Sequence, residues 1–275
     1  MVSNLLAGGQ SSVYRGQGME FDEVREYSAG DDVRMIDWNV TSRMGSAFTK
    51  VFREERELNL VLLVDVSASV LQGAAGQHLA VARIVAILAL AAEQAGDSVS
   101  AYLFTDRLEH WLPTRRGRGH VLRLINEVAE IAPRGRGSDL GLALRTVFGL
   151  LHRRATCVMV SDFRSTGFWP QLTTLRRRHE VLAIRVGGPQ DGGFPRIGGT
   201  ELQDPESGRV IYAAGSSRRF RRSYREYWEC HFRKLRDGCR RSRVELLEIA
   251  DGDDPGAALA AFFRRRARRT APHRA

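Results

Sequence analysis

From residue 58 onward, short apolar runs alternate with segments in which apolar residues recur every three or four positions. The run 58–64 is apolar almost throughout, as is typical of a strand buried on both faces of a sheet. Further strands are predicted at 99–104, 108–112, 156–160, 181–186 and 244–249. Helices are predicted at 79–93, 119–131, 139–152, 169–178, 217–238 and from 255 to about 268. This alternation predicts an α/β, Rossmann-like fold with a mostly parallel sheet and helices on both faces.

Two features depart from a purely parallel sheet. The strands 99–104 and 108–112 are joined only by residues 105–107. This link is too short for a crossover, so the pair is predicted to be antiparallel and one edge strand to be reversed. The turn signal Asp204-Pro-Glu-Ser-Gly208 lies between two short apolar stretches. It predicts a small hairpin inserted near 198–213.

Residues 1–57 do not follow the alternating pattern. They are polar, punctuated by glycine and charged at nearly every third position, so they are too ionic to form a core of their own. We expect an irregular, charged N-terminal extension over 1–57, packed on an α/β domain that spans 58–275 and ends in basic helices.

Composition narrows the class of protein. A chain of 275 residues suits one large domain with an appendage. Its longest apolar run, 84–92, is far shorter than the roughly 20 residues of a membrane helix, and its beginning does not resemble a signal peptide. Three cysteines without CxxC spacing argue against a disulfide framework or a structural zinc site. We expect a cytoplasmic protein without a transmembrane segment.

The basic charge is concentrated near the C-terminus. Ten arginines lie within 218–243 and six within 264–274, whereas the whole chain has a net charge of only +10, so the remainder is mildly acidic. Aromatic residues interrupt the first of these segments: Phe220, Tyr224, Tyr227, Trp228 and Phe232. Such a segment can bind nucleic acid through phosphate contacts and base stacking. The spacing of three and four residues favours the buried stripe of an amphipathic helix instead.

Oxygen donors follow the predicted strands. Asp65, Ser67 and Ser69 come after the first strand, Ser138 precedes the helix at 139–152, and Asp162 follows the strand at 156–160. Loops at the carboxyl ends of strands gather at one edge of such a sheet. Donors of this kind suit a hard divalent cation, Mg²⁺ by preference, or Mn²⁺ or Ca²⁺. Each residue also has a structural interpretation, the serines as helix N-caps and Asp162 as a turn residue.

This donor set resembles the metal-ion-dependent adhesion site of von Willebrand factor A domains. In those domains a D-x-S-x-S sequence, a downstream Thr and an Asp at a strand end surround the metal. Ser138 stands where Thr is usual and retains the hydroxyl group. The resemblance implies a von Willebrand A-like domain with a metal site formed by Asp65, Ser67, Ser69, Ser138 and Asp162.

The N-terminal segment carries a second resemblance. Its pattern is similar to the signature of the bacterial family catalogued as domain of unknown function 58, which precedes a von Willebrand A-like domain. The matching positions are Tyr14-Arg-Gly-Gln-Gly18, Phe21, Arg25, Tyr27, Gly30, Asp31, Asp32, Arg34, Asp37, Trp38 and Arg43. The sequence departs from the family pattern in two ways. It shows no segment like the membrane anchor that the family often carries. In the loop 187–192, Gly188-Pro189-Gln190-Asp191 replaces Asp-Pro-x-Glu.

The charged residues of this signature have two interpretations. They form either an ion-paired network that holds the extension onto the sheet, with Trp38 as its apolar anchor, or a recognition surface beside the metal. Charge-dense segments are usually paired internally or solvated, which favours the network.

The expected function is that of a non-enzymatic, metal-dependent protein-binding module. A cation held by hydroxyls and two carboxylates keeps an open position, which an acidic residue of a partner can occupy as the sixth ligand. The family resemblance implies a MoxR-type AAA+ ATPase as partner and a chaperone-like maturation role. The chain has no ATPase motif of its own, because neither Lys50 nor Lys234 lies in G-x4-G-K-[ST].

Two alternatives belong to other classes. Asp65 at a strand end also resembles the nucleophile of a metal-dependent phosphohydrolase, but position 67 lacks the second acid and neither lysine is near. Nucleic-acid binding through the C-terminal arginines is the other alternative, and the aromatic periodicity argues against it.

Overall fold

The computed structural model describes residues 19–28, 30–54, 58–71, 77–188, 191, 193–204, 206 and 208–270. These residues belong to two compact units, one made by the described residues up to 54 and the other by those from 58 onward. The segment Tyr14–Gly18 of the family signature lies outside the described residues.

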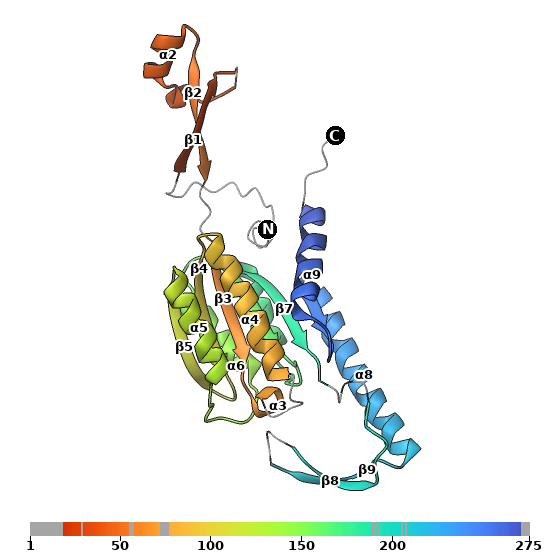
Figure 1. The fold of residues 1–275 in the computed structure, drawn as a ribbon. Coiled ribbons are helices and arrows are strands. Elements are labelled where there is room, and N and C mark those ends of the chain that lie inside the picture. The colour runs from red at the N-terminus through yellow and green to blue at the C-terminus, as the bar shows by residue number, and fades with distance from the viewer. Residues whose placement is uncertain are drawn as a thin grey trace. The chain divides into compact units, whose positions relative to one another are not determined.

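The larger unit is built on a six-stranded sheet with the order β10-β7-β6-β3-β4-β5 (Figure 1). All neighbouring strands are parallel except β4 and β5, which pair antiparallel with Tyr102 opposite Trp111. The strands are β3 (Asn59–Asp65), β4 (Ser98–Phe104), β5 (Leu108–Arg115), β6 (Thr156–Ser161), β7 (Glu180–Val186) and β10 (Glu245–Ile249). The predicted α/β class, mostly parallel sheet and reversed edge strand are confirmed.

Helices connect the strands and cover both faces of this sheet. They are α4 (Gln77–Gln94), α5 (Arg118–Glu130), α6 (Leu140–Leu150), α7 (Trp169–Arg178), α8 (Arg218–Arg241) and α9 (Pro255–Thr270). A single additional turn, α3 (Ala68–Leu71), follows β3. The helical period predicts every long helix to within a few residues, whereas one turn is too short to produce a periodic signal.

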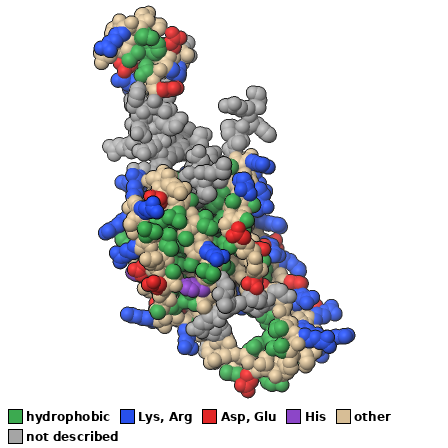
Figure 2. Space-filling view, in the orientation of Figure 1, with side chains coloured by type: hydrophobic (Ala, Val, Ile, Leu, Met, Phe, Trp, Pro, Cys, Tyr) green, Lys and Arg blue, Asp and Glu red, His purple; other side chains and the backbone are tan. Residues whose placement is uncertain are grey.

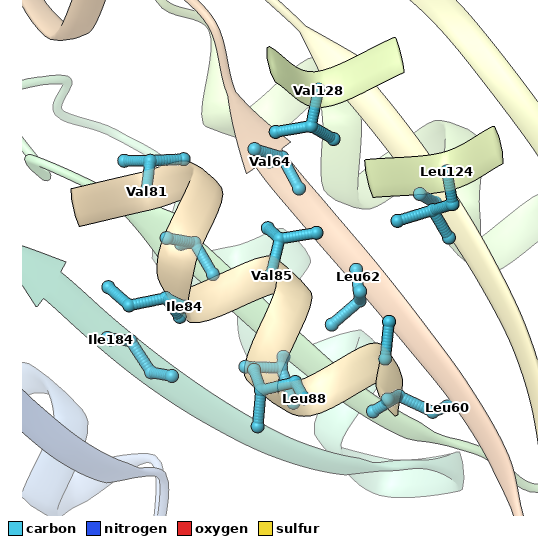
Figure 3. Packing of buried hydrophobic residues seen from close by; sticks show 14 of the residues in the cluster. Leu60, Leu62, Val64, Val81, Ile84, Val85, Leu88, Leu124, Val128 and Ile184 are labelled. Atoms are coloured by element: carbon cyan, nitrogen blue, oxygen red, sulfur yellow. The ribbon is translucent and has the colours of Figure 1, made fainter. Parts of the chain in front are cut away.

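Two apolar cores lie on opposite faces of the sheet because successive strand residues point to opposite sides. In β3, Leu60, Leu62 and Val64 pack with α4, α5 and α9, and Figure 3 shows part of this cluster. Val61 and Leu63 pack with α6, α7 and α8 on the other face. The central strand is apolar from Leu60 to Val64 because both of its faces are buried.

The predicted inserted hairpin is present as β8 (Gly199–Gln203) and β9 (Val210–Ala214), paired antiparallel. The long helix α8 follows it. Phe232 and Leu235 are buried in this helix, while Phe220, Tyr224 and Trp228 are half-buried along the same stripe. Tyr227 lies off the stripe and is exposed. The buried-stripe interpretation of the aromatic residues is therefore confirmed for four of the five.

The N-terminal unit is more regular than the expected irregular extension. Its strands β1 (Met19–Glu26) and β2 (Phe48–Glu54) pair antiparallel, and a 3₁₀ turn, η1 (Val33–Met35), and a helix, α2 (Trp38–Met44), lie between them. The expectation of irregular structure was wrong, because backbone pairing and side-chain caps organise this unit. Asp32 caps η1, and Asp37 accepts hydrogen bonds from the Asn39 and Val40 amides that begin α2.

Ion pairs connect several signature residues within this unit. Arg25 donates to Asp31 at 2.7 Å, and Lys50 lies 3.3 Å from Asp37. Tyr27 donates its hydroxyl to the Asp31 carbonyl, which adds a polar link to the same turn. These pairs of Arg25, Asp31 and Asp37 lie within the N-terminal unit. The network that holds the extension onto the sheet domain stays a prediction, and Trp38, its expected apolar anchor, is 70% exposed at the first position of α2.

Three other signature residues lie in a turn or on the surface of the N-terminal unit. Gly30 adopts a φ of +115° in the turn before η1, a conformation that side-chain-bearing residues avoid. Arg34 and Arg43 lie on the exposed surface of η1 and α2. Among the helices that the structure describes, none is both long and apolar enough to cross a bilayer.

The two-sided core leads to a stability prediction. Leu62 is fully buried in β3, and its replacement by alanine should lower the free energy of unfolding by about 2–5 kcal/mol through lost contacts and a cavity. Leu79→Ala, on the exposed face of α4, is the matched control and should change it by less than about 0.5 kcal/mol. Urea denaturation measures both. Equal losses in the two variants would contradict the packing in Figure 3.

Candidate functional site

Asp65 ends β3 and is fully buried where three loops meet. One carboxylate oxygen, Oδ1, accepts the amide hydrogen of Ser67 at 3.0 Å. The other, Oδ2, accepts the hydroxyls of Ser138 at 2.8 Å and Ser161 at 2.7 Å. A single carboxylate thus joins the loop after β3, the loop before α6 and the end of β6. Charge-assisted hydrogen bonds of this length are strong when they are shielded from water.

The loop after β3 presents two further hydroxyls. The Oγ atoms of Ser67 and Ser69 lie 3.1 Å apart, and both residues are buried. The Ser67 carbonyl accepts the amides of Val70 and Leu71, so the chain turns into α3 directly after Asp65. The Ala68 amide donates to the Arg136 carbonyl at 2.9 Å, which attaches this loop to the one that carries Ser138.

Backbone contacts hold the loop that carries Ser138. Glu109 accepts the amides of Arg134 and Gly135 at 3.0 and 2.7 Å. A Cβ atom at Gly135 would collide with the Thr105 and Asp106 side chains, so glycine is required there. Asp139 caps α6 by accepting the Leu142 amide at 2.8 Å. The interpretation of Ser138 as the cap of this helix is therefore wrong, and its hydroxyl is directed at Asp65.

Asp162 provides the second carboxylate, next to the end of β6. Its Oδ1 accepts the Arg164 amide at 3.1 Å, which is the turn role that the sequence allows. Its Oδ2 is buried and accepts no hydrogen bond from any described residue, although the Arg164 Nε lies 3.4 Å away. Phe163 adopts a φ of +54° between these residues, and its amide donates to the Ser161 hydroxyl. A non-glycine residue in this region is strained, which is a feature concentrated at functional sites.

The two carboxylates repel each other in a poorly solvated place. Burial raises the pKa of Asp65, and the hydroxyls of Ser67, Ser161 and Ser138 oppose this effect. Burial, and then the nearby charge of Asp65, raise the pKa of Asp162 to about 6, and Arg164 only partly compensates. Such a pair favours any species that supplies positive charge between its members.

Arg164 begins a chain of ion pairs that leads away from the site. Its Nη2 donates to Asp191 at 3.0 Å, and Asp191 also accepts from Arg185 at 2.6 Å. Arg185 lies 3.2 Å from Glu248 in β10, and Arg236 of α8 donates to the same carboxylate. Asp191 is the acidic residue of the loop 187–192 that departs from the family pattern. It pairs with two arginines on neighbouring loops and strands.

The donors present are compatible with a hard divalent cation. No group of three His, Cys, Asp or Glu side chains that could hold a metal occurs among the described residues. The candidate site is of a different kind, with two carboxylates and several hydroxyls, and oxygen donors of this type suit Mg²⁺. Asp162 Oδ2 is buried and accepts no hydrogen bond from a described residue, so this oxygen is available to a cation.

All five predicted ligand residues therefore meet at one edge of the sheet: Asp65, Ser67, Ser69, Ser138 and Asp162. Sequence analysis missed two neighbours of this cluster, Ser161 and Arg164. Ser161 had a signal, because it is the last residue of an apolar strand and directly precedes Asp162. Arg164 had none, since only the folded chain places its side chain near Asp162.

Most aromatic residues of α8 pack against other side chains of the domain. Trp228 stacks on Phe232 with ring centroids 5.7 Å apart and contacts the Arg164 guanidinium at 4.4 Å. Figure 2 shows basic side chains projecting from the molecule along this helix. The aromatic faces that would stack bases are thus mostly occupied, which weakens the nucleic-acid alternative.

Comparisons with known proteins place these features in context. The family described as Protein of unknown function DUF58 matches residues 23–233. Uncharacterized proteins of Mycobacterium bovis and Mycobacterium tuberculosis are each 36% identical over 215 residues, which cover 76% of this chain and 68% of theirs.

Two solved structures resemble the fold. The conserved hypothetical protein BatB from Bacteroides thetaiotaomicron has a TM-score of 0.50 at 15% identity, covering 78% of this chain and 98% of that one. An aerotolerance-related membrane protein from Bacteroides fragilis has a TM-score of 0.50 at 15% identity, covering 77% and 99%. At this identity the likeness concerns the α/β fold alone.

Carboxylate repulsion yields a second prediction. At pH 7 in chelator, Asp162→Asn should raise the free energy of unfolding by about 1–2 kcal/mol, because the charged form of this buried group is disfavoured in the folded state. A carboxyl pKa that is raised on folding makes the wild type less stable as pH rises. The gain should therefore shrink as pH falls from about 7 toward 4.

Asp251→Asn, in an exposed turn, is the control and should change stability little at any of these pH values. Urea denaturation at several pH values measures both variants. A loss of stability in Asp162→Asn at pH 7 would contradict the repulsion between Asp65 and Asp162.

Proposed function

The chain belongs to the family described as Protein of unknown function DUF58, and we propose that it is a non-enzymatic protein-binding module that depends on a divalent cation. The observation that carries this proposal is the meeting of Asp65, Asp162 and the serine hydroxyls at the carboxyl edge of the sheet. Ligands bind at this edge in open α/β sheets.

Asp65 organises the site in this proposal. It accepts three hydrogen bonds, which orient the Ser67, Ser138 and Ser161 groups. Asp65, Ser67, Ser69, Ser138 and Asp162 would hold Mg²⁺, or Mn²⁺ or Ca²⁺, directly or through water. A bound cation would supply a Lewis-acid position that accepts an external carboxylate. An acidic side chain of a partner protein is the proposed occupant.

The proposed subtype is a von Willebrand A-like domain with a metal-ion-dependent adhesion site. Two features support it: the single reversed strand at one edge of the sheet, and the D-x-S-x-S turn that directly follows the central strand. Ser138 supplies the hydroxyl from the second loop, where those domains usually carry Thr.

We propose a MoxR-type AAA+ ATPase as the partner, in chaperone-like maturation of other proteins. This identification rests on the family resemblance. The chain itself is not suited to phosphoryl transfer, because Ser67 occupies the position where a phosphohydrolase needs a second acid. Lys50 pairs with Asp37 in the N-terminal unit, and Lys234 lies on the exposed face of α8.

Cation binding can be tested directly. Calorimetry with Mg²⁺ alone should register one binding event for the wild type and none for Asp65→Asn, because the amide removes the charge on which the cluster depends. The asparagine can still accept the hydroxyls of Ser138 and Ser161, so the variant should remain folded by circular dichroism. Asp251→Asn is the control and should bind like the wild type.

Partner binding forms the second half of this test. The purified MoxR-type ATPase of the same organism should bind the wild type in Mg²⁺ and dissociate in EDTA, as read by surface plasmon resonance. Binding that persists in EDTA, or in Asp65→Asn, would contradict a cation-dependent mechanism.

A further inference from the structure

A cavity of about 580 Å³ opens between α7 and the C-terminal end of α8. Four of its lining residues are arginines, and no acidic residue that the structure describes lines it. The arginines are Arg176 and Arg177 of α7, Arg241 of α8, and Arg243 just after α8. The volume lies within the roughly 300–1,000 Å³ that is typical of small-ligand sites. None of the lining residues belongs to the candidate cation site.

Close packing between the two helices forms one wall of this cavity. A Cβ atom at Gly238 of α8 would collide with the ring of Trp169, so only glycine permits this approach. The centroid of the Trp169 ring lies 4.7 Å from that of Phe168, which is buried in the core. The arginines therefore extend from two elements whose relative position is fixed by packing.

A hydrogen bond orients one of the arginines. Arg176 Nε donates to the Arg243 carbonyl at 3.2 Å, which connects the last turn of α7 to the turn after α8. Arg243 adopts a φ of +54°, a region that non-glycine residues rarely occupy, and its amide donates to the Arg240 carbonyl at 3.1 Å. The turn is thus held by the backbone in the conformation that places Arg243 at the cavity.

The protein does not neutralise the positive charge of this cavity. None of the four arginines forms an ion pair with an acidic residue in the described part of the chain, and α7 contains no Asp or Glu. Asp237, near the end of α8, lies 3.8 Å from Arg240, which does not line the cavity. Arginines in the last turn of a helix also stabilise its carboxyl end. That effect does not explain Arg243, which lies beyond α8.

A second basic cavity, of about 430 Å³ between α8, β10 and α9, shows the contrast. Arginines line it too, but Glu245 and Glu248 lie among them. Arg236 donates to Glu248 at 2.7 Å, and Arg266 pairs with Glu180. There the chain supplies its own counter-charge. At the α7–α8 cavity the counter-charge has to come from outside, and a concave site lined by one sign of charge concentrates anions.

We propose that the cavity between α7 and α8 binds a small anion with two or more phosphate groups. Guanidinium groups match phosphate oxygens in a two-pronged geometry, which makes arginine the preferred residue for such ligands. One phosphate group carries about two negative charges at neutral pH, so four arginines suit more than one of them. A concave site favours a small oligophosphate over a nucleic-acid duplex. The inference is independent of the proposed function, because the two sites share no residue.

Calorimetry with sodium tripolyphosphate is the test, at low salt and in buffer freed of divalent cations. The full chain should bind one equivalent. Arg177→Gln combined with Arg241→Gln should weaken the affinity about tenfold or more, because two charge-assisted contacts are lost. Both side chains are exposed, so the double variant should remain folded by circular dichroism. The corresponding double lysine variant keeps the charge without the forked donor and should lie between the two.

The matched control is Arg219→Gln combined with Arg233→Gln. These arginines are exposed on α8 outside the cavity, and their loss changes the net charge equally. This variant should bind tripolyphosphate like the wild type. An equal loss of affinity in both double glutamine variants would show that the general basic field attracts the anion, and would overturn the site.

The remaining outcomes identify the source of the phosphates. Equal affinity for tripolyphosphate and a nucleoside triphosphate would support recognition of the phosphates alone, and tighter binding of the nucleotide would support a nucleotide at the same site. Absence of binding to either would refute the inference and leave the cation site untouched. A DNA duplex that binds more tightly than both, and is weakened alike by the two glutamine pairs, would assign the arginines to a nucleic-acid surface instead.

Discussion

The buried carboxylate of Asp65 is the interaction on which the site depends. It touches all three loops, through the Ser67 amide and the Ser138 and Ser161 hydroxyls. Since β3 lies between β4 and β6, this charge is buried, and it is tolerated because the neighbouring loops supply hydrogen-bond donors. Removal of those donors would leave an uncompensated charge beside the core.

A series of ion pairs connects the site loops to more distant strands of the sheet. Asp162 is followed by Arg164, which pairs with Asp191, and from there arginine and acid alternate through Arg185 to Glu248 on β10. Arg185 also packs over the Phe232 ring at 3.8 Å. The edge strand, the loop after β7 and helix α8 are therefore attached to the site by the same pairs. Buried pairs of this type specify geometry more than they add stability.

The sequence predicts those parts of the fold whose signal is local. The apolar run at 58–64 reports burial on both faces, and the three-residue link at 105–107 forces an antiparallel pair. The N-terminal strands escaped prediction because the bulge between Phe21 and Glu23 breaks their alternation and their residues are largely charged. Four of the five ligand candidates were predictable from strand ends, and Ser138 from its place before a helix. Arg164 was not, because only the fold of the loop after β6 brings its guanidinium to within 3.4 Å of the Asp162 carboxylate.

The two carboxylates of the site, Asp65 and Asp162, differ in how many hydrogen bonds the protein donates to them. This difference limits which parts of the fold a bound cation could change. Asp65 is satisfied by the protein, so the loops after β3 and before α6 remain assembled whether or not a cation is present. Asp162 has one buried oxygen that accepts no hydrogen bond from a described residue. In the proposed function, a change that a cation causes is therefore expected at the end of β6. The loop that follows β6 contacts α8, where His231 pairs with the Phe163 carbonyl. In that proposal the group that assembles the loops, Asp65, is distinct from the group that would respond to a ligand, Asp162.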